Sequence, residues 1–408
     1  MNRNDENKLI LAIKTHPMFT RLAKVTTMLP PPRLFTNRYI HTFDVIKVAN
    51  IINAKVVNKY KLIKPINLKV SCLAHDLGHC CFAHETEEVV NKFLSFKLCL
   101  PISKICFSHA VNGALVLAIS SKPNNFSSNF SNFKLFSNSA YISDAAIIVD
   151  SVIKHAFNES YLDGVYFKFI ESQYKHYTGR SLIKAGVNNS IPLFQTGYYV
   201  RVSDNIATKN SDILDLFELY HSRKISRRSG TYYTLCHKYV NDIALHSRDI
   251  KSGICTIEDV LKGDALLKAE ANLLKQTYSF QYKQSITNEV QKTVENALEV
   301  ISEKPWLLKS CGFNQRYSYI QKVFKAYASK ITNIKELNKA NLDRVKKEYY
   351  SNPHDDSNPY VLIYRQYICA VTYELTNFTD KDFISFAMIL ASKTQDMAPI
   401  STYLINLF

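Results

Sequence analysis

Residues that interrupt helices are scarce in this chain, which has only 10 glycines and 12 prolines among its 408 residues. Apolar residues recur at helical spacing through most of the sequence, for example over residues 39–49 and 206–217, whereas the alternation typical of strands is rare. With so few glycines and prolines, long helices joined by polar loops explain the sequence most simply. The sequence therefore predicts an all-α fold.

Two segments break this helical pattern. Residues 122–139 form a low-complexity Asn/Ser stretch with four phenylalanines, which predicts a loop or a contact with a partner. Residues 351–359 contain two prolines and separate a charged helix predicted over 334–350 from a C-terminal helical run. We expect one compact unit with appendages: an N-terminal helical segment over 1–36, a core over 37–220, and a C-terminal helical region over 221–408 packed on that core.

Composition narrows the class of protein. The sequence has no run of about 18 apolar residues, and residues 1–14 carry Asn, Asp, Glu and Lys before any apolar stretch, which is not typical of a secretory signal. We therefore expect a cytoplasmic protein with no membrane partner. The nine cysteines are an odd number and lack the paired spacing of a zinc finger. Neither a disulfide framework nor a structural zinc site is expected, and Cys80 and Cys81 are interpreted as packing residues.

The formal net charge of +16 favours polyanionic ligands such as nucleotides or nucleic acid. Arg223, Lys224, Arg227 and Arg228 lie close together beside His221, which predicts a loop that reaches phosphate groups. The alternative interpretation is a lysine-rich composition spread over a solvated surface.

The densest group of chemically capable side chains lies in residues 72–88, CLAHDLGHCCFAHETEE. Neighbouring residues of a helix point about 100° apart, so His75 and Asp76 can serve one metal ion only if another helix completes the ligand set. The helix predicted over residues 38–49 supplies a candidate in His41, which shares a face with Arg38. Imidazole together with carboxylate suits Mn²⁺, Fe²⁺ or Zn²⁺, and Mg²⁺ less well.

These segments resemble a known family. R-x-x-H over residues 38–41, His75-Asp76, and G-H-x-x-F-x-H-x-x-E over residues 78–87 resemble the HD superfamily and, more narrowly, the deoxyguanosinetriphosphate triphosphohydrolase family. Thr42 stands where the family has serine, and Cys80-Cys81 stand where it has two prolines. Residues 202–208 resemble the family's last metal-binding segment, with Thr208 in place of a tyrosine that contacts the nucleotide. Residues 107–109 and 365–372 are similar to further family segments.

The resemblance implies an HD-type helical fold with additional C-terminal helices. It implies metal-dependent hydrolysis of deoxynucleoside triphosphates, with dGTP favoured, to a deoxynucleoside and inorganic triphosphate, in a homo-oligomer such as a hexamer or tetramer. The metal, Mn²⁺ or Mg²⁺ with Fe²⁺ or Zn²⁺ as alternatives, would be held by His41, His75, Asp76 and Asp204. His84 would transfer protons with Glu87 as its partner, and the substrate would contact Arg38, His79, His109, Asp212 and Tyr367.

Several of these roles have simpler alternatives. Arg38 can form a structural ion pair, Glu87 can be a helix N-terminal charge favoured by the helix dipole, His79 can orient a ligand, and His109 can be a buried, hydrogen-bonded histidine. For the whole protein, the alternatives are an HD-type nucleotide phosphodiesterase or 5'-nucleotidase, or a nucleic-acid-binding regulatory HD protein without turnover. Single-stranded DNA or another nucleic acid is also a candidate effector.

Overall fold

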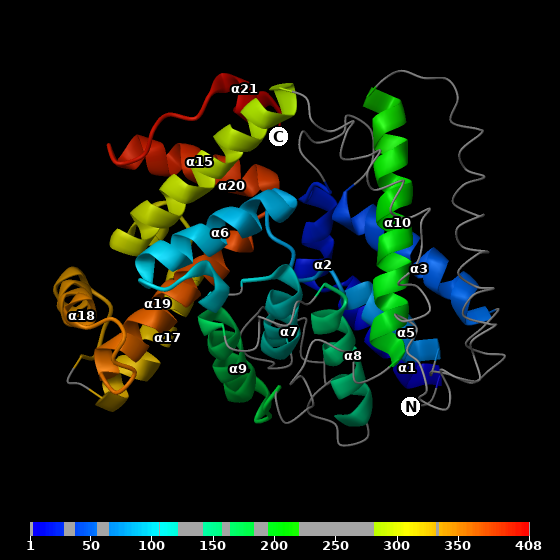
Figure 1. The fold of residues 1–408 in the computed structure, drawn as a ribbon, viewed down its shortest axis with the longest axis horizontal. Coiled ribbons are helices and arrows are strands. Elements are labelled where there is room, and N and C mark those ends of the chain that lie inside the picture. The colour runs from blue at the N-terminus through cyan, green and yellow to red at the C-terminus, as the bar shows by residue number, and fades with distance from the viewer. Residues whose placement is uncertain are drawn as a thin grey trace. The chain divides into compact units, whose positions relative to one another are not determined.

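The computed structural model describes residues 3–27, 37–54, 65–105, 107–120, 142–156, 164–182, 195–219, 281–331 and 334–407. Apart from one isolated β-bridge between Thr26 and Asn37, every regular element in these ranges is a helix (Figure 1), so the all-α prediction is confirmed. The predicted loop over 122–139 and the basic cluster at 223–228 lie outside the described residues. The three-part division of the chain stays a prediction, because residues 220–280 also lie outside.

The chain forms two compact units. Unit 1 comprises Met1–His79, Ser108–Glu159 and Ile170–Gln284, and unit 2 comprises Cys80–Phe107, Ser160–Phe169 and Ser285–Phe408. The helices α9 (Val165–Thr178) and α15 (Gln281–Glu303) each contribute residues to both.

Unit 1 is built around the long helix α10. Three further helices, α3, α5 and α8, each pack against α10, and α5 also contacts both α3 and α8 (Figure 1). The described helices of this unit are α1 (Arg3–Lys14), α2 (Pro17–Arg21), η1 (Leu22–Lys24), α3 (Arg38–Ile52), α5 (Pro65–Ala74), α7 (His109–Ser120), α8 (Ile142–Lys154) and α10 (Gln195–Leu219).

Local capping explains where α3 begins, and the helix predicted over residues 38–49 is confirmed. Asn37 is its N-cap, with a side-chain oxygen that accepts a hydrogen bond from the Ile40 backbone N–H at 2.9 Å. The end of α5 corrects a prediction. His75 and Asp76 do not lie within a helix, because α5 ends at Ala74 and the chain turns there, with Leu77 N–H donating to the Ala74 carbonyl at 3.1 Å.

Gly78 brings this turn against the start of α7. A Cβ atom on Gly78 would lie 2.1 Å from the Gly113 nitrogen and 2.3 Å from the His109 carbonyl oxygen, so only glycine fits. The side-chain amide of Asn112 also donates to the Gly78 carbonyl at 3.0 Å. The backbone that carries His75 is therefore fixed against the backbone that carries His109.

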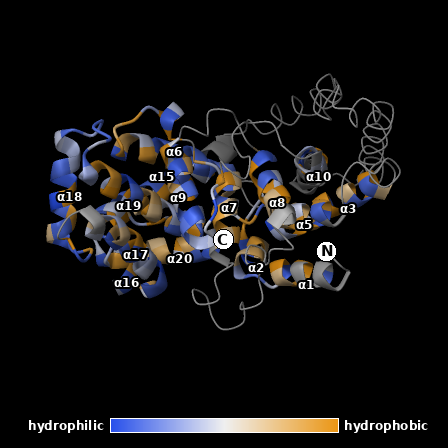
Figure 2. Cartoon of the chain, turned by 90° about the horizontal axis from the view of Figure 1, so that it is seen from below, coloured by the Kyte–Doolittle hydropathy of each residue, from blue (hydrophilic) through white to orange (hydrophobic). Residues whose placement is uncertain are grey.

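Unit 2 is centred on α19, which packs against α17, α18 and α6. Most of α19 is buried, whereas α18 buries only Leu342, Val345 and Tyr349 and is mainly hydrophilic in Figure 2. Its described helices are α6 (Ala83–Lys97), η3 (Ile102–Lys104), α15 (Gln281–Glu303), α16 (Leu307–Ser310), α17 (Asn314–Ile331), α18 (Lys339–Ser351), α19 (Pro359–Thr376), α20 (Asp380–Lys393) and α21 (Thr402–Leu407).

The predicted break at residues 351–359 is confirmed, since α18 ends at Ser351 and α19 begins at Pro359. The charged helix α18 begins at Lys339 rather than at residue 334, because Asn338 caps it by accepting from the Asn341 N–H at 2.9 Å. Cys80 and Cys81 are fully buried, as predicted for packing residues.

Within the described part of the chain, no individual helix combines the length and the apolar character needed to cross a membrane. Residues Ala83–Lys97 and Ile102–Ala118 reach that length and composition only when they are taken together as a broken pair.

Gly78→Ala tests the close approach in unit 1. The new methyl group would overlap backbone atoms that cannot move aside, so we expect a loss of unfolding free energy of about 3 kcal/mol or more. Gly179→Ala is the matched control: Gly179 has φ +72° but open space around it, so only backbone strain of about 1–2 kcal/mol is expected. Urea denaturation measures both, and equal losses would contradict the packing role of Gly78.

His16 gives unit 1 a defined response to acid. Its Nδ1 accepts from the Met18 N–H at 3.0 Å and caps α2, while burial lowers its pKa from 6.5 to about 4. As pH falls below 6.5, His16 becomes protonated in the unfolded chain but stays neutral in the folded protein. The free energy of unfolding therefore decreases until about pH 4, by roughly 3 kcal/mol in all.

His16→Asn keeps a good N-cap but cannot titrate. We expect the variant to lose roughly 2–3 kcal/mol less unfolding free energy than wild type between about pH 7.5 and about pH 4.5. Urea denaturation at the two pH values measures this difference. Parallel losses in both proteins would show that His16 is not the titrating group.

Candidate metal centre

The four predicted metal ligands converge in unit 1. His41 comes from α3, His75 and Asp76 from the turn after α5, and Asp204 from α10. The Asp204 Oδ1 lies 2.9 Å from His41 Nε2 and 3.7 Å from His75 Nε2, and the Asp76 Oδ1 lies 3.4 Å from His75 Nε2. Ligand atoms of His41, His75 and Asp204 all lie within 4.8 Å of one another. These buried groups can hold a metal ion.

The tautomer of His75 fits this interpretation. Its Nδ1 lies 2.7 Å from the Cys72 carbonyl oxygen, which can only accept, so Nδ1 carries a proton and, in the neutral ring, the lone pair that a metal needs is on Nε2. This Nε2 is fully buried and has no hydrogen-bond partner. An orphaned, buried nitrogen facing two carboxylates is a costly arrangement without a cation and a suitable one with it. Two imidazoles and two carboxylates are the donor set of Mn²⁺, Fe²⁺ or Zn²⁺.

Arg38 neutralises the buried carboxylate of Asp76. Its Nη1 lies 3.3 Å from Asp76 Oδ2, so the ion pair expected as the alternative to phosphate binding is present, and Nη2 donates to the Thr27 carbonyl at 3.4 Å. Burial alone raises the pKa of the Asp76 carboxyl, but His75, Arg38 and His41 outweigh burial and hold that pKa below its ordinary value. Asp76 is therefore an anion at neutral pH and available as a ligand.

Asp204 is the more accessible ligand, with 21% of its side chain exposed. Burial raises its pKa, yet the hydrogen bond with His41 and the proximity of His75 lower it well below the ordinary value. The Thr208 hydroxyl, one helical turn further along α10, donates to Asp204 Oδ1 at 3.3 Å. Thr208 thus helps to orient the Asp204 carboxylate.

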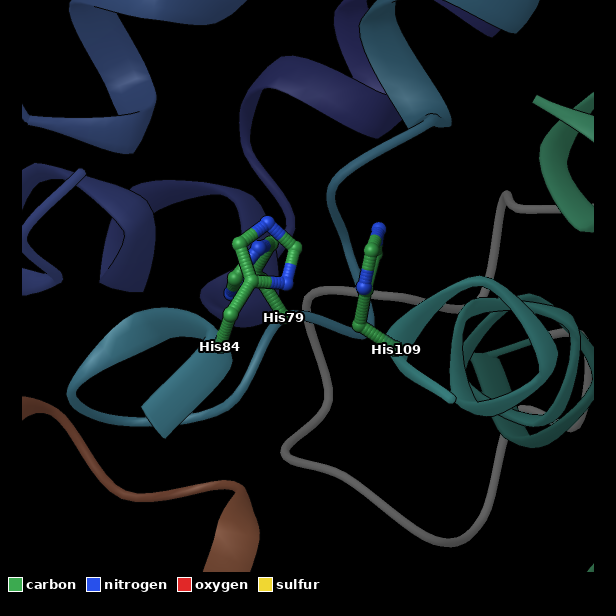
Figure 3. Close-up of side chains that lie close together, drawn as sticks. All are labelled: His79, His84 and His109. Atoms are coloured by element: carbon green, nitrogen blue, oxygen red, sulfur yellow. The ribbon is translucent and has the colours of Figure 1, made fainter. Parts of the chain in front are cut away.

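Further imidazoles adjoin this ligand set in unit 1. The rings of His79 and His109 stack with centroids 4.4 Å apart (Figure 3, which also draws His84 of unit 2). The Nε2 atoms of His109 and His155 lie 3.3 Å apart, and the ring of His155 meets that of His75 edge to face, with centroids 5.1 Å apart. Burial, followed by the effects of His75 and His109, lowers the pKa of His155 to about 3, so its imidazole is neutral at pH 7.

The predicted acid/base pair lies in unit 2, at the start of α6. His84 Nδ1 lies 3.3 Å from Glu87 Oε2, and the His84 side chain is 62% exposed. The two preceding residues, Phe82 and Ala83, have left-handed φ angles of 56° and 55°. A side-chain oxygen of Asp380 accepts from the Phe82 N–H at 2.8 Å and holds this turn.

Two predicted substrate contacts stay predictions. Tyr367 is fully buried in unit 2, where its hydroxyl donates to the Ser302 carbonyl at 2.9 Å. Asp212 belongs to α10, but its side chain lies outside the described part. Conversely, the sequence indicates His155 only as one of several possible phosphate contacts, because a single histidine after the apolar run of α8 has no local signal that ranks it above the others.

Comparison of the sequence with models of known protein families and with curated proteins finds no match.

Removing one ligand tests the centre directly. Mutation of residues that only hydrogen-bond to metal ligands typically weakens metal binding by roughly 10–100-fold. We expect His75→Ala or Asp204→Asn, which change a proposed ligand itself, to weaken Mn²⁺ binding by more than that. Calorimetric titration of the metal-free protein measures the affinity. His176→Ala, which removes an exposed histidine of α9, is the control and should bind as wild type does. Unchanged affinity in both ligand variants would contradict the assignment.

Proposed function

We propose that this chain is a metal-dependent phosphohydrolase that converts deoxynucleoside triphosphates, with dGTP favoured, to a deoxynucleoside and inorganic triphosphate. The single observation that carries the proposal is the convergence of His41, His75, Asp76 and Asp204 around the buried, unpartnered Nε2 of His75. The bond that is cleaved and the base preference come from the family resemblance of residues 38–41, 75–76 and 78–87.

A divalent cation at these ligands would supply Lewis-acid chemistry, polarising a phosphoryl oxygen and lowering the pKa of water. The protein residues have separate tasks. Arg38, held on Asp76, keeps that carboxylate ionised and oriented, so the ion pair maintains the ligand set even where no phosphate is near. The chain's net charge of +16 favours capture of a polyanionic substrate.

Proton transfer is assigned to His84. An imidazole that is largely exposed can exchange protons with substrate and solvent, and a carboxylate 3.3 Å from its Nδ1 fixes the tautomer and orientation. The buried imidazoles of the metal centre are poorly placed for that task because their nitrogens face carboxylates and one another. Cleavage at the α-phosphorus requires a proton for the departing nucleoside oxygen, and we assign its donation to His84.

Product analysis tests the reaction. The four dNTPs and GTP are incubated with Mn²⁺ or Mg²⁺, and the phosphate products are resolved by ³¹P NMR. We expect deoxynucleoside and intact triphosphate, with loss of both in His75→Ala/Asp76→Ala. Pyrophosphate or orthophosphate instead would support the phosphodiesterase or nucleotidase alternative. Absence of turnover with every metal would overturn the proposal and favour the nucleic-acid-binding alternative.

The pair in unit 2 has its own test. We expect His84→Gln to lower kcat by about 10²–10⁴-fold while Mn²⁺ affinity is retained, because a proton donor is lost and no ligand is removed. Glu87→Gln should lower kcat less, since it only orients the imidazole. If Glu87 acts merely as a helix N-terminal charge, its variant will lose about 0.3–1 kcal/mol of stability and keep its kcat.

A further inference from the structure

We propose that Asp380 is a positioning residue for His84 and acts through the backbone that leads into α6. The inference deepens the proposed function and rests on it for the assignment of proton transfer to His84. Both residues belong to unit 2, as does the backbone between Cys80 and α6. Asp380 lies 298 residues after Phe82 in the sequence and outside the segments that carry the family resemblance.

The backbone before His84 adopts a conformation that its own residues do not favour. Phe82 and Ala83 have φ angles of 56° and 55°, in the left-handed region where a Cβ atom is unfavourable. Ala83 is the first residue of α6 and His84 the second, so these two angles set the direction in which the His84 side chain leaves the turn. Contacts from elsewhere in the fold must hold the turn in place.

The corner between α19 and α20 supplies those contacts. Two successive backbone groups donate to it: the Cys81 N–H to the Thr376 carbonyl at 3.2 Å, and the Phe82 N–H to Asp380 Oδ1 at 2.8 Å. Thr376 is the last residue of α19 and Asp380 the first of α20. From α6 itself, the Thr86 hydroxyl donates to the Cys81 carbonyl at 2.5 Å. The turn is thus hydrogen-bonded on both sides of its strained residues.

The Asp380 carboxylate is the strongest acceptor at this corner. Thr379 already caps α20 by accepting from the Asp382 N–H at 3.0 Å, so Asp380 does not have to fill that place. The Asp380 residue is buried, with 4% of its surface exposed, and a buried carboxylate requires hydrogen-bond donors. Hydrogen bonds to an ionised acceptor are roughly twice as strong as neutral ones. Loss of the carboxylate should therefore release the turn more than loss of a neutral acceptor.

The corner that carries Asp380 is itself held firmly. Arg316 of α17 donates to the Glu374 carbonyl and, at 3.1 Å, to the Asn377 carbonyl, and its Nη1 lies 3.2 Å from Glu374 Oε2. Its guanidinium also lies over the Phe378 ring, 3.8 Å from the centroid. These contacts fix the end of α19 directly before Asp380, so the carboxylate can impose a position on the turn.

Hydrogen exchange and kinetics on the full-length, Mn²⁺-loaded protein test the inference. We expect Asp380→Ala to speed exchange in the peptide that contains Phe82. It should also lower kcat for dNTP hydrolysis by up to about 10²-fold, the cost of a small misplacement of a reacting group, with little change in KM. Asp382→Ala removes an exposed acid from the same helical turn and should change neither quantity.

A double variant separates positioning from a general structural effect. If Asp380 acts through His84, Asp380→Ala should lower kcat no further when His84 is already replaced in His84→Gln. Asp380→Asn keeps a neutral acceptor in the same place, so its exchange rate and kcat should fall between those of wild type and Asp380→Ala. Circular dichroism confirms each fold, and Asp380→Asn, alone and with His84→Gln, carries the test if Asp380→Ala does not fold.

The outcomes distinguish this inference from the proposed function. Faster exchange with a wild-type kcat in the Asp380 variants would overturn the positioning role and leave the hydrolase intact. The same fractional loss of kcat in the His84→Gln background would also overturn it, because the effect would not pass through His84. Unchanged exchange in every Asp380 variant would show that the carboxylate does not hold the turn. Absence of turnover in wild type would overturn the proposed function and, with it, the positioning role.

Discussion

The burial of two carboxylates among the helices of unit 1 is the constraint on which its architecture depends. An ionised carboxylate enclosed in protein loses several kcal/mol of hydration unless opposite charge replaces it. Arg38 supplies one such charge to Asp76 at 3.3 Å, and the neighbouring imidazole nitrogens have lone pairs as well as protons to offer. Because one guanidinium balances only one carboxylate, Asp204 needs a protonated histidine or a cation, and a cation satisfies both the anions and the lone pairs.

This electrostatic requirement explains why three helices must meet. His41, the His75-Asp76 turn and Asp204 are far apart in sequence, and each is brought in by packing of α3, α5 and α10 on one another. The contact is apolar on most sides: Val45, Val48 and Ile52 of α3 are fully buried, as are Val70 and Leu73 of α5. Apolar burial thus supplies the stability with which the chain holds charged groups away from water.

The sequence predicts those parts of the site that are local. His75 and Asp76 are adjacent, Arg38 and His41 are one helical turn apart, and His84 and Glu87 share a face of α6, so spacing alone places each pair. Asp204 is found only through the weaker resemblance of residues 202–208. Spacing does not identify His155, because a single histidine forms no periodic pattern. Its neighbours in the structure come close only through the packing of α8 against α5 and α10.

The all-α class follows from helical periodicity and from the scarcity of glycine and proline, but the turn at His75 does not. Apolar residues at helical spacing, such as Val70, Leu73 and Leu77, continue past Ala74 and indicate a continuing helix. The sequence shows Gly78 but not the backbone that approaches it. The close contact of Gly78 with Gly113 is a property of two segments together. A pattern along the sequence does not reveal a contact between two separate segments. Here such a contact determines where the candidate ligands His75 and Asp76 lie.

The two sets of histidines differ in a way that fits different chemistry. His41 and His75 are buried and face carboxylates, which favours a fixed ligand, whereas His84 is 62% exposed beside Glu87, which favours a group that gains and loses protons. The left-handed Phe82 and Ala83 raise the energy of the backbone before His84 by about 1–3 kcal/mol each. The Asp380 carboxylate and the ring of Phe383, at 5.6 Å, hold Phe82 in that turn. Strain of this kind persists only where its surroundings enforce it, and here it starts α6 abruptly, so that His84 emerges from a buried segment on the first helical turn.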